Sequence, residues 1–478
     1  KYTLANSPNG RYLLFLRDGQ IWSHELRNGK QRNLTGKLKT HFTNQQDDTL
    51  AVEKRPYGRG TWLVDSSAVL LYDRFNIWLV APNGSRAVKL TDGKKKQIRH
   101  RLSQASFHED DDGAIDPKRS LYIALYGERT KKSGYGRLAL GPKGRKPGKL
   151  ETLLWDDKMV LNLNRARDTD VYTLTMERND LSRDLYLAGP DLEEPRKISK
   201  TNAFQKKFRW SRSELIDYQN KHGVKLQGSL IYPANYKPGR KYPMIVYIYE
   251  KRSHELHRYY TPSEKHPYNP CVFSAEGYFV FQPDIVYRPQ EPGISAVECV
   301  VPAVKKVLEK EPPTLVLSGV NRGGNLGEDM TYSGTVAAAM EATLLGIPAV
   351  ALSQVTTDGE PVRWSTAIKH LPELLQRLTT QSWPLGVLIN VNFPDVAEDK
   401  VKGVAVSIQG RRKPGSKLDK RHDPRGRPYY WICSARTEQP SLKGSDLAAI
   451  YGGKISVTPL HLDLTHRATC KSLRAALE

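Results

Sequence analysis

Over roughly the first 210 residues, short segments of alternating apolar and polar positions recur at intervals of about 40 residues. The unit at Ser7–Thr35 contains an apolar run, a tight Asp-Gly turn, an Ile-Trp pair and an Asn-Leu-Thr ending. The same order returns at Asp65–Gly93, and looser copies occupy Leu121–Leu153 and Val171–Ile198. Such strands and turns at a fixed period are typical of β-propeller blades, so we predict a partial β-propeller of about four blades. A β-sandwich is the alternative, which the regular repeat disfavours.

Beyond Tyr242 the pattern changes to strands that alternate with helices. Continuous apolar segments predict strands, and apolar residues at helical spacing predict helices. The predicted strands are Tyr242–Tyr249, Gly277–Gln282, Thr314–Ser318 and Val387–Val391, and the predicted helices are Ser295–Lys310 and Val336–Leu345. This alternation indicates a three-layer α/β domain with a doubly wound, mostly parallel sheet. From Asp423 onward, the pattern predicts a β-rich C-terminal arm.

Charge is unevenly distributed along the chain, whose formal net charge is +23. Residues 1–310 hold 54 Lys and Arg against 35 Asp and Glu, whereas residues 311–478 hold 20 against 16. A positive field of this size favours anionic partners. The basic residues are nevertheless scattered between the predicted hairpins, without a single basic stripe or an aromatic RNA-binding motif. This distribution favours a solvated basic surface over nucleic-acid binding.

Several classes of protein are disfavoured by composition. No run of 18 or more apolar residues is present, so we expect no membrane-spanning helix. The four cysteines, Cys271, Cys299, Cys433 and Cys470, are far apart and indicate neither a disulfide framework nor a zinc site. The chain begins at Lys1 without a signal sequence, which we interpret as a fragment or a processed form. Composition therefore assigns the protein to no cellular compartment.

The strongest candidate for chemistry is a glycine-rich segment after a predicted buried strand. Ser318–Gly327 reads SGVNRGGNLG, and Tyr332–Thr335 opens the next predicted helix. Glycines let the backbone approach a phosphate, and an Asn carbonyl oxygen is a suitable ligand for a hard divalent cation. Hydroxyl groups and free N–H groups at a helix start favour an anion. Taken alone, however, a glycine-rich turn of this kind is more often structural than functional.

Thr314–Glu341, TLVLSGVNRGGNLGEDMTYSGTVAAAME, resembles the core of the SurE ("survival protein E") family of metal-dependent nucleotidases. Asn390–Asp395, Gly444–Asp446 and Thr458–Thr465 follow in the order found in that family, and the resemblance covers Pro313–Glu478. It implies a hydrolase of nucleoside monophosphates that uses a divalent cation, Mg²⁺ or Mn²⁺. The resemblance further implies a small-molecule phosphate substrate, a homo-oligomer and a cytoplasmic location.

The resemblance also assigns roles to individual residues. Asn321 matches the asparagine that binds the metal, and Asn325, Ser333 and Thr335 match residues that border the phosphate. The family needs in addition two adjacent aspartates in an Asn-Asp-Asp-Gly motif and a serine in an Arg-Ser-Gly-x-Ser loop. Neither motif occurs in this chain. We therefore expect impaired phosphatase activity.

Residues 224–310 resemble a different family, the prolyl oligopeptidase family of serine peptidases. The segments KLQGSLIYPANYKPGRKYPMIVYIYE and YRPQEPGISAVECVVPAVKKVLEK carry this resemblance. An α/β-hydrolase needs a Gly-x-Ser-x-Gly elbow, and the corresponding segment here is Gly319–Gly323, with Asn321 at the serine position. An amide cannot be the nucleophile of acyl transfer. Tyr249 matches the tyrosine that donates to the oxyanion in relatives, so we interpret it as a vestigial oxyanion residue.

The chain thus reads as a fusion whose halves meet near Lys310. We expect a partial propeller in residues 1–210, the start of an α/β-hydrolase-like domain in 211–310 and a SurE-like α/β domain without its N-terminal half in 311–478. A joined sheet would place Met244–Tyr249 beside Thr314–Ser318. Glu250 would then lie beside Asn321 and complete a weak cation site. Three interpretations remain open: an impaired SurE-type phosphomonoesterase, a serine peptidase without its nucleophile, and a non-catalytic scaffold or gene-joining artefact.

Overall fold

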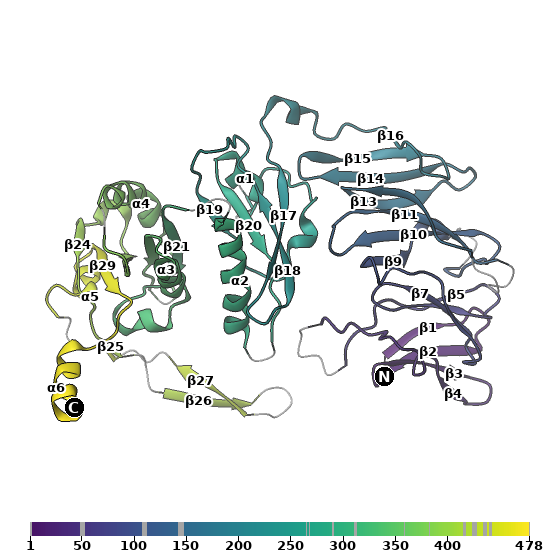
Figure 1. The fold of residues 1–478 in the computed structure, drawn as a ribbon, viewed down its shortest axis with the longest axis horizontal. Coiled ribbons are helices and arrows are strands. Elements are labelled where there is room, and N and C mark those ends of the chain that lie inside the picture. Colours follow the sequence, from purple (N-terminus) through teal and green to yellow (C-terminus); the bar gives the residue numbers. More distant parts are fainter. Residues whose placement is uncertain are drawn as a thin grey trace. The chain divides into compact units, whose positions relative to one another are not determined.

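The computed structural model divides into two compact units, residues 1–311 and 312–478 (Figure 1). We describe each unit by itself. The residues that the structure describes are 2–47, 53–107, 112–141, 148–263, 265–266, 268–288, 291–309, 313–357, 359–381, 383–413, 417–422, 428–433, 437–438 and 442–477. The predicted junction near Lys310 lies outside these residues.

The first unit begins with four sheets, each made of four antiparallel strands. The first sheet holds β1 (Tyr2–Asn6), β2 (Tyr12–Arg17), β3 (Gln20–Glu25) and β4 (Gln31–Asn33). The second holds β5 (Thr61–Trp62), β6 (Val69–Tyr72), β7 (Ile77–Val80) and β8 (Ala87–Lys89). The third holds β9 (Ile98–Leu102), β10 (Ser120–Gly127), β11 (Ser133–Ala139) and β12 (Glu151–Asp156). The fourth holds β13 (Met159–Arg165), β14 (Tyr172–Arg178), β15 (Leu181–Ala188) and β16 (Arg196–Lys197).

A repeated side-chain contact shows that the first, second and fourth of these sheets share one local design. The hydroxyl oxygens of Thr35, Thr91 and Ser199 each accept a hydrogen bond from the backbone N–H group 14 residues earlier, at 2.9, 3.0 and 2.8 Å. In each case the donor lies on the third strand of its sheet, so the residue after the fourth strand is tied back to the third. The repeat seen in the sequence therefore corresponds to a repeat of hydrogen bonding.

Apolar side chains of successive sheets share common cores. One core combines Leu14 of β2 with Val69 of β6, and the next combines Leu70 of β6 with Ile123 of β10. A third core places the ring of Tyr122 4.9 Å from that of Tyr172 on β14. Because neighbouring strand residues point to opposite faces, each middle sheet contributes to a core on both sides. The sheets consequently follow one another in chain order (Figure 1).

A mixed α/β sheet completes the first unit. Its strand order is β17 (Ser213–Gln219), β18 (Lys225–Ile231), β20 (Phe279–Pro283) and β19 (Met244–Val246). The β19–β20 pair is parallel, and the other two pairs are antiparallel. Helix α1 (Pro270–Ala275) precedes β20. Helix α2 (Pro292–Leu308) buries Cys299, Ala303 and Val307 against this sheet.

The second unit is built around a five-stranded sheet of order β21 (Val316–Arg322), β22 (Ala349–Gln354), β23 (Val387–Phe393), β29 (Ile455–His461) and β24 (Val404–Val406). Strands β21, β22 and β23 are parallel, and β29 is antiparallel to β23. The helices are α3 (Gly334–Leu344), α4 (Trp364–Thr379), α5 (Asp446–Tyr451) and α6 (Arg467–Leu477). Two small ladders pair β25 (Arg412–Lys413) with β28 (Thr437–Glu438), and β26 (Lys417–His422) with β27 (Pro428–Cys433).

The two strands of the expected joined sheet lie in the sheets of different units. Strand β19 pairs with β20 and β21 pairs with β22, and these pairs belong to two different sheets. The predicted strand Tyr242–Tyr249 is also shorter, because the chain leaves the ladder after Val246. The loop that follows is held by Asp284, whose Oδ1 accepts hydrogen bonds from the N–H groups of Arg252 and Ser253 at 2.7 and 2.8 Å.

Candidate functional site

Polar side chains line up across the carboxyl ends of the parallel strands in the second unit. Asn321 on β21 is paired with Ser353 on β22, and Ser353 is paired with Asn392 on β23. The row continues to Ser456 on the antiparallel strand β29. Ser353, Asn392 and Ser456 are all fully buried. Open α/β sheets bind ligands at this edge, so the row marks the candidate site.

A bulge in β21 sets the position of Asn321. Ser318 is paired with Ala351 and Asn321 with Ser353, so two residues of β21 stand opposite Leu352. Gly319 has φ +133°, and a Cβ atom there would lie 2.3 Å from the carbonyl oxygen of Leu352. Only glycine fits such a position. The glycine of the sequence motif is therefore required by the bulge that brings Asn321 level with Ser353.

Asn325 fixes the glycine-rich loop to the strand ends. Its Nδ2 donates a 2.6 Å hydrogen bond to Oγ of Ser353, and its backbone N–H donates a 2.8 Å bond to Oδ1 of Asn392. Its carbonyl oxygen accepts hydrogen bonds from the amides of Asn390 and Asn392 at 2.9 and 3.1 Å. The residue is 6% exposed. Its side chain thus points into the protein and holds the loop in place.

Asp446 supports the same loop from the other side and was not among the predicted site residues. It is fully buried, and its Oδ2 accepts a 2.9 Å hydrogen bond from the N–H of Gly327. Its Oδ1 accepts hydrogen bonds of 2.8 Å from the N–H groups of Gly410 and Leu447. The Gly-Ser-Asp segment was the signal in the sequence for this residue. Ser353 had no such signal, because only the strand register shows its place in the row.

Ser333 and Thr335 lie at the start of α3. Ser333 is the N-cap residue, and its Oγ accepts a 3.1 Å hydrogen bond from the N–H of Val336. Both residues are half-buried. Helix α3 packs its apolar face, including Val336 and Ala339, with Ala351 of β22. The first N–H groups of this 11-residue helix are therefore held close to the sheet that carries the polar row.

The metal implied by the family resemblance does not fit the residues at this edge. Nδ2 of Asn321 donates a 2.9 Å hydrogen bond to the carbonyl of Gly323, which leaves one amide oxygen for a cation. The nearby carboxylates have other partners: Asp446 binds three N–H groups, and Oδ2 of Asp395 accepts hydrogen bonds from the N–H and hydroxyl of Thr357. Among the described residues, no group of three or more His, Cys, Asp or Glu side chains is placed to hold a metal.

Tyr249 and Glu250 do not join the site through a shared sheet. Both are exposed and follow β19 in the first unit, where the carbonyl of Tyr249 accepts a hydrogen bond from the hydroxyl of Tyr287. Asn321 belongs to β21 in the second unit. The predicted pairing of Glu250 with Asn321 depends on adjacency of β19 and β21, which belong to the sheets of different units, and it stays a prediction.

Comparison with known proteins matches part of the chain to one family. The family model described as "Survival protein SurE" matches residues 293–416, which begin within α2. A "5'-nucleotidase SurE" from Paramagnetospirillum magneticum is 52% identical over 179 residues, covering 37% of this chain and 69% of that protein. The chain belongs to the SurE family. The SurE relative from Brucella suis strain ATCC 23445 is likewise 52% identical, over 183 residues that cover 38% of this chain and 71% of the relative.

Two solved structures are similar to part of this chain. The SurE protein from Aquifex aeolicus is 34% identical, with a TM-score of 0.34, and the match covers 42% of this chain and 76% of that one. A putative dipeptidyl aminopeptidase IV from Bacteroides ovatus is 12% identical, with a TM-score of 0.45, and the match covers 74% of this chain and 51% of that one. Within the described part of the chain, no helix is long and apolar enough to cross a membrane.

Proposed function

We propose that the second unit is a nucleotidase-type hydrolase domain that binds the phosphate of nucleoside monophosphates and hydrolyses it weakly. The observation that carries this proposal is the preserved loop: Asn325 ties the glycine-rich segment to Ser353 and Asn392 at the carboxyl edge of the sheet. The relatives at 52% identity are named 5'-nucleotidases, which supports the reaction class.

In this proposal, the chain's own groups bind and orient the phosphate. The flexible backbone at Gly323 and Gly324 permits close approach of phosphate oxygens to the loop. The first N–H groups of α3 and the hydroxyl of Thr335 would donate to the same anion. A divalent cation such as Mg²⁺ or Mn²⁺ would supply a polarised phosphate and an activated water in the family reaction. The described residues do not build a site for it, so we infer impaired turnover and assign no step to it.

The first unit is proposed to be a propeller-like scaffold without peptidase activity. Four consecutive four-stranded sheets, three of which share a 14-residue hydrogen bond, support blade-like units. The peptidase alternative lacks support, because the position expected for the nucleophile holds Asn321. A homo-oligomer, as the family resemblance implies, stays part of the proposal.

Two measurements on the full chain test the nucleotidase proposal. We expect adenosine monophosphate to bind in calorimetry, and Thr335→Val to weaken that binding about tenfold by removing one donor to a charged group. Thr331→Val is the matched control, because its exposed hydroxyl donates to the carbonyl of Glu328 within the preceding turn. Turnover of p-nitrophenyl phosphate with Mn²⁺ should stay well below about 1 s⁻¹.

The turnover measurement tests the expected impairment, and the binding measurement tests phosphate recognition. Turnover at or above about 1 s⁻¹ would show that the chain builds a working metal site after all. Absence of binding at about 10 mM nucleotide, the weak end of measurable affinity, would contradict phosphate recognition itself.

A further inference from the structure

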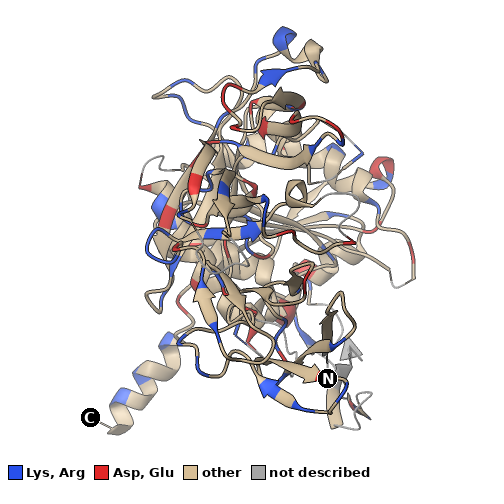
Figure 2. Ribbon diagram, turned by 90° about the vertical axis from the view of Figure 1, so that its right-hand side faces the viewer, with Lys and Arg blue, Asp and Glu red and all other residues tan. Residues whose placement is uncertain are grey.

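A strongly basic cavity lies wholly within the first unit. Its volume is about 970 Å³, and it is bordered by the β8–β9 loop, the β10–β11 turn, the start of β18 and the loop after β19. Eight Lys or Arg residues and two carboxylates, Glu128 and Asp284, line it, which gives an excess of six positive charges. Elsewhere the basic residues are spread over many strands and loops (Figure 2). Their convergence here is therefore a feature of the fold.

The two carboxylates of the cavity are already engaged. Oε2 of Glu128 accepts a 3.1 Å hydrogen bond from Nε of Arg74. Asp284 accepts two backbone hydrogen bonds and a 2.6 Å bond from the hydroxyl of Ser253. Two carboxylates stand against eight cations in the lining. The positive charge of the cavity is thus not balanced by its own acidic residues.

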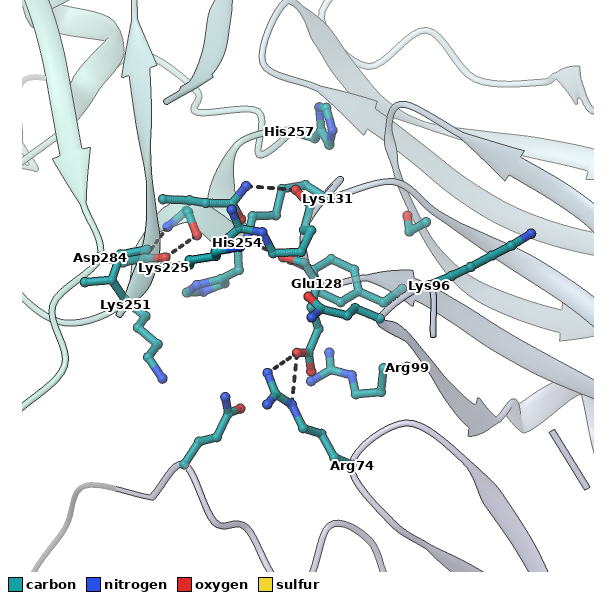
Figure 3. Close-up of a pocket in the computed structure, with 18 of the residues that line it drawn as sticks. Arg74, Lys96, Arg99, Glu128, Lys131, Lys225, Lys251, His254, His257 and Asp284 are labelled. Atoms are coloured by element: carbon teal, nitrogen blue, oxygen red, sulfur yellow. Dashed lines mark hydrogen bonds and ion pairs between the residues drawn. The ribbon is translucent and has the colours of Figure 1, made fainter. Parts of the chain in front are cut away.

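Several of the cations have no acidic partner. Among the residues that the structure describes, no carboxylate forms an ion pair with Lys95, Lys96, Lys225 or Lys251. The guanidinium of Arg99 lies 5.0 Å from the ring centre of Tyr126 and likewise has no described carboxylate partner. Figure 3 shows Arg99 and Lys251 directed toward the middle of the cavity from different sides. Cations arranged in this way repel one another unless an anion lies between them.

One cation of the cavity is buried. Lys131 is 7% exposed, and its Nζ donates a 2.7 Å hydrogen bond to the carbonyl of Glu128. Burial lowers the pKa of Lys131 to about 8. The charged groups that act on it are Asp284, Glu128, Asp217, Arg129 and the titratable His254. Burying an ammonium group is costly, and a bound anion would offset that cost.

We propose that this cavity binds a small molecule that carries several phosphate groups. Its volume is at the upper end of the roughly 300–1,000 Å³ of typical ligand sites. A chain of phosphates concentrates several charges within one small ligand and so reaches cations that enter from different sides. The planar guanidinium of Arg99 suits paired phosphate oxygens, and the lysines act as point charges. An acidic peptide carries one charge per residue and fills more space for the same charge.

The test measures binding of tripolyphosphate to the full chain by calorimetry at physiological salt, without divalent cations. We expect saturable binding with a Kd of roughly 10 µM or tighter. The double variant Arg99→Gln/Lys251→Gln should weaken it about tenfold or more, because two charge-assisted contacts are lost. The matched control is Arg27→Gln/Lys30→Gln, which removes the same charges from an exposed turn outside the cavity. We expect it to change Kd by less than about twofold, since distant exposed charges are screened.

Further measurements distinguish a nucleotide from an inorganic polyphosphate as the ligand and test the role of Lys131. Adenosine triphosphate should compete with tripolyphosphate for the cavity. If the nucleotide binds more tightly than tripolyphosphate, the nucleoside also contributes to the binding free energy. Binding at pH 8 should be accompanied by proton uptake, because the anion raises the pKa of Lys131, and Lys131→Met should abolish that uptake. Absence of saturation below about 1 mM would overturn the proposal. Equal weakening by the control variant, or equally tight binding of hexaglutamate, would overturn it as well.

Discussion

Nδ2 of Asn325 donates a 2.6 Å hydrogen bond to Oγ of Ser353, across 28 residues of sequence. This contact joins the glycine-rich loop to the end of the neighbouring parallel strand. Asn325→Ala should lower the free energy of unfolding of the second unit by about 1–3 kcal/mol, because buried partners of the amide lose their hydrogen bonds. Denaturant titration followed by a probe in that unit would measure it.

Asn321→Ala is the matched control for this prediction. Asn321 is half-buried, and its amide makes one hydrogen bond, to the carbonyl of Gly323. We expect a loss of stability below about 1 kcal/mol. Equal losses for the two variants would show that Asn325 does not hold the loop.

Gly319→Ala should disrupt the bulge in β21. A Cβ atom at this position would lie 2.3 Å from the carbonyl oxygen of Leu352, at a φ of +133°. Such a clash with backbone requires a shift of the strand, so we expect a loss of about 2 kcal/mol or more. Gly334→Ala at the start of α3 meets no atom within 4 Å and should be neutral or slightly stabilising. Similar melting temperatures for both variants would contradict the claim that the bulge requires glycine at position 319.

His100 should make the first unit sensitive to mild acid. Burial, together with the charge of Arg101, lowers its pKa to about 4, and its Nδ1 has no hydrogen-bond partner among the described residues. The folded state therefore disfavours protonation relative to the unfolded state, where the pKa is near 6.5. Its contribution to stability is complete above about pH 6.5 and is lost as the pH falls toward 4.

The change that tests this prediction is His100→Gln. This variant should flatten the dependence of stability on pH between about 6.5 and 4. The exposed His41 supplies the control, and His41→Gln should leave the profile of the parent protein unchanged. Thermal unfolding at a series of pH values would provide the comparison. An unaltered profile for His100→Gln would mean that another group causes the acid sensitivity.

Because the hydroxyl contact recurs in three sheets, we expect its removal to lower the free energy of unfolding in each of them. In the parent protein, the N–H of Ile77 donates a 3.0 Å hydrogen bond to the hydroxyl of Thr91. Thr91→Val keeps the side-chain shape but removes this acceptor. We expect a loss of about 1–3 kcal/mol from this buried donor. Thr169→Val at an exposed position should change stability by less than about 0.5 kcal/mol. If Thr91→Val were equally mild, the contact would be incidental to the sheet.

Local pattern was sufficient for many of the strands and helices. Strand alternation over Ser7–Thr35 and Asp65–Gly93 corresponds to the last three strands of two four-stranded sheets, because the side-chain period of a strand is visible in the sequence itself. The glycine-rich segment was placed at the end of a predicted buried strand, and Asn321 lies near the end of β21. The segment Tyr332–Thr335 was predicted to open a helix, and α3 begins at Gly334.

Tertiary structure decided which strands share a sheet and which side chains meet. A short apolar strand such as Met244–Val246 pairs with whichever edge the rest of the chain presents, so its sequence could not exclude β21 as a neighbour. Ser353 entered the polar row through the register of β22, and Lys131, Lys225 and Lys251 met in one cavity although their elements are far apart in the chain. Contacts of this kind depend on long-range pairing and loop closure, which the period of a local segment does not encode.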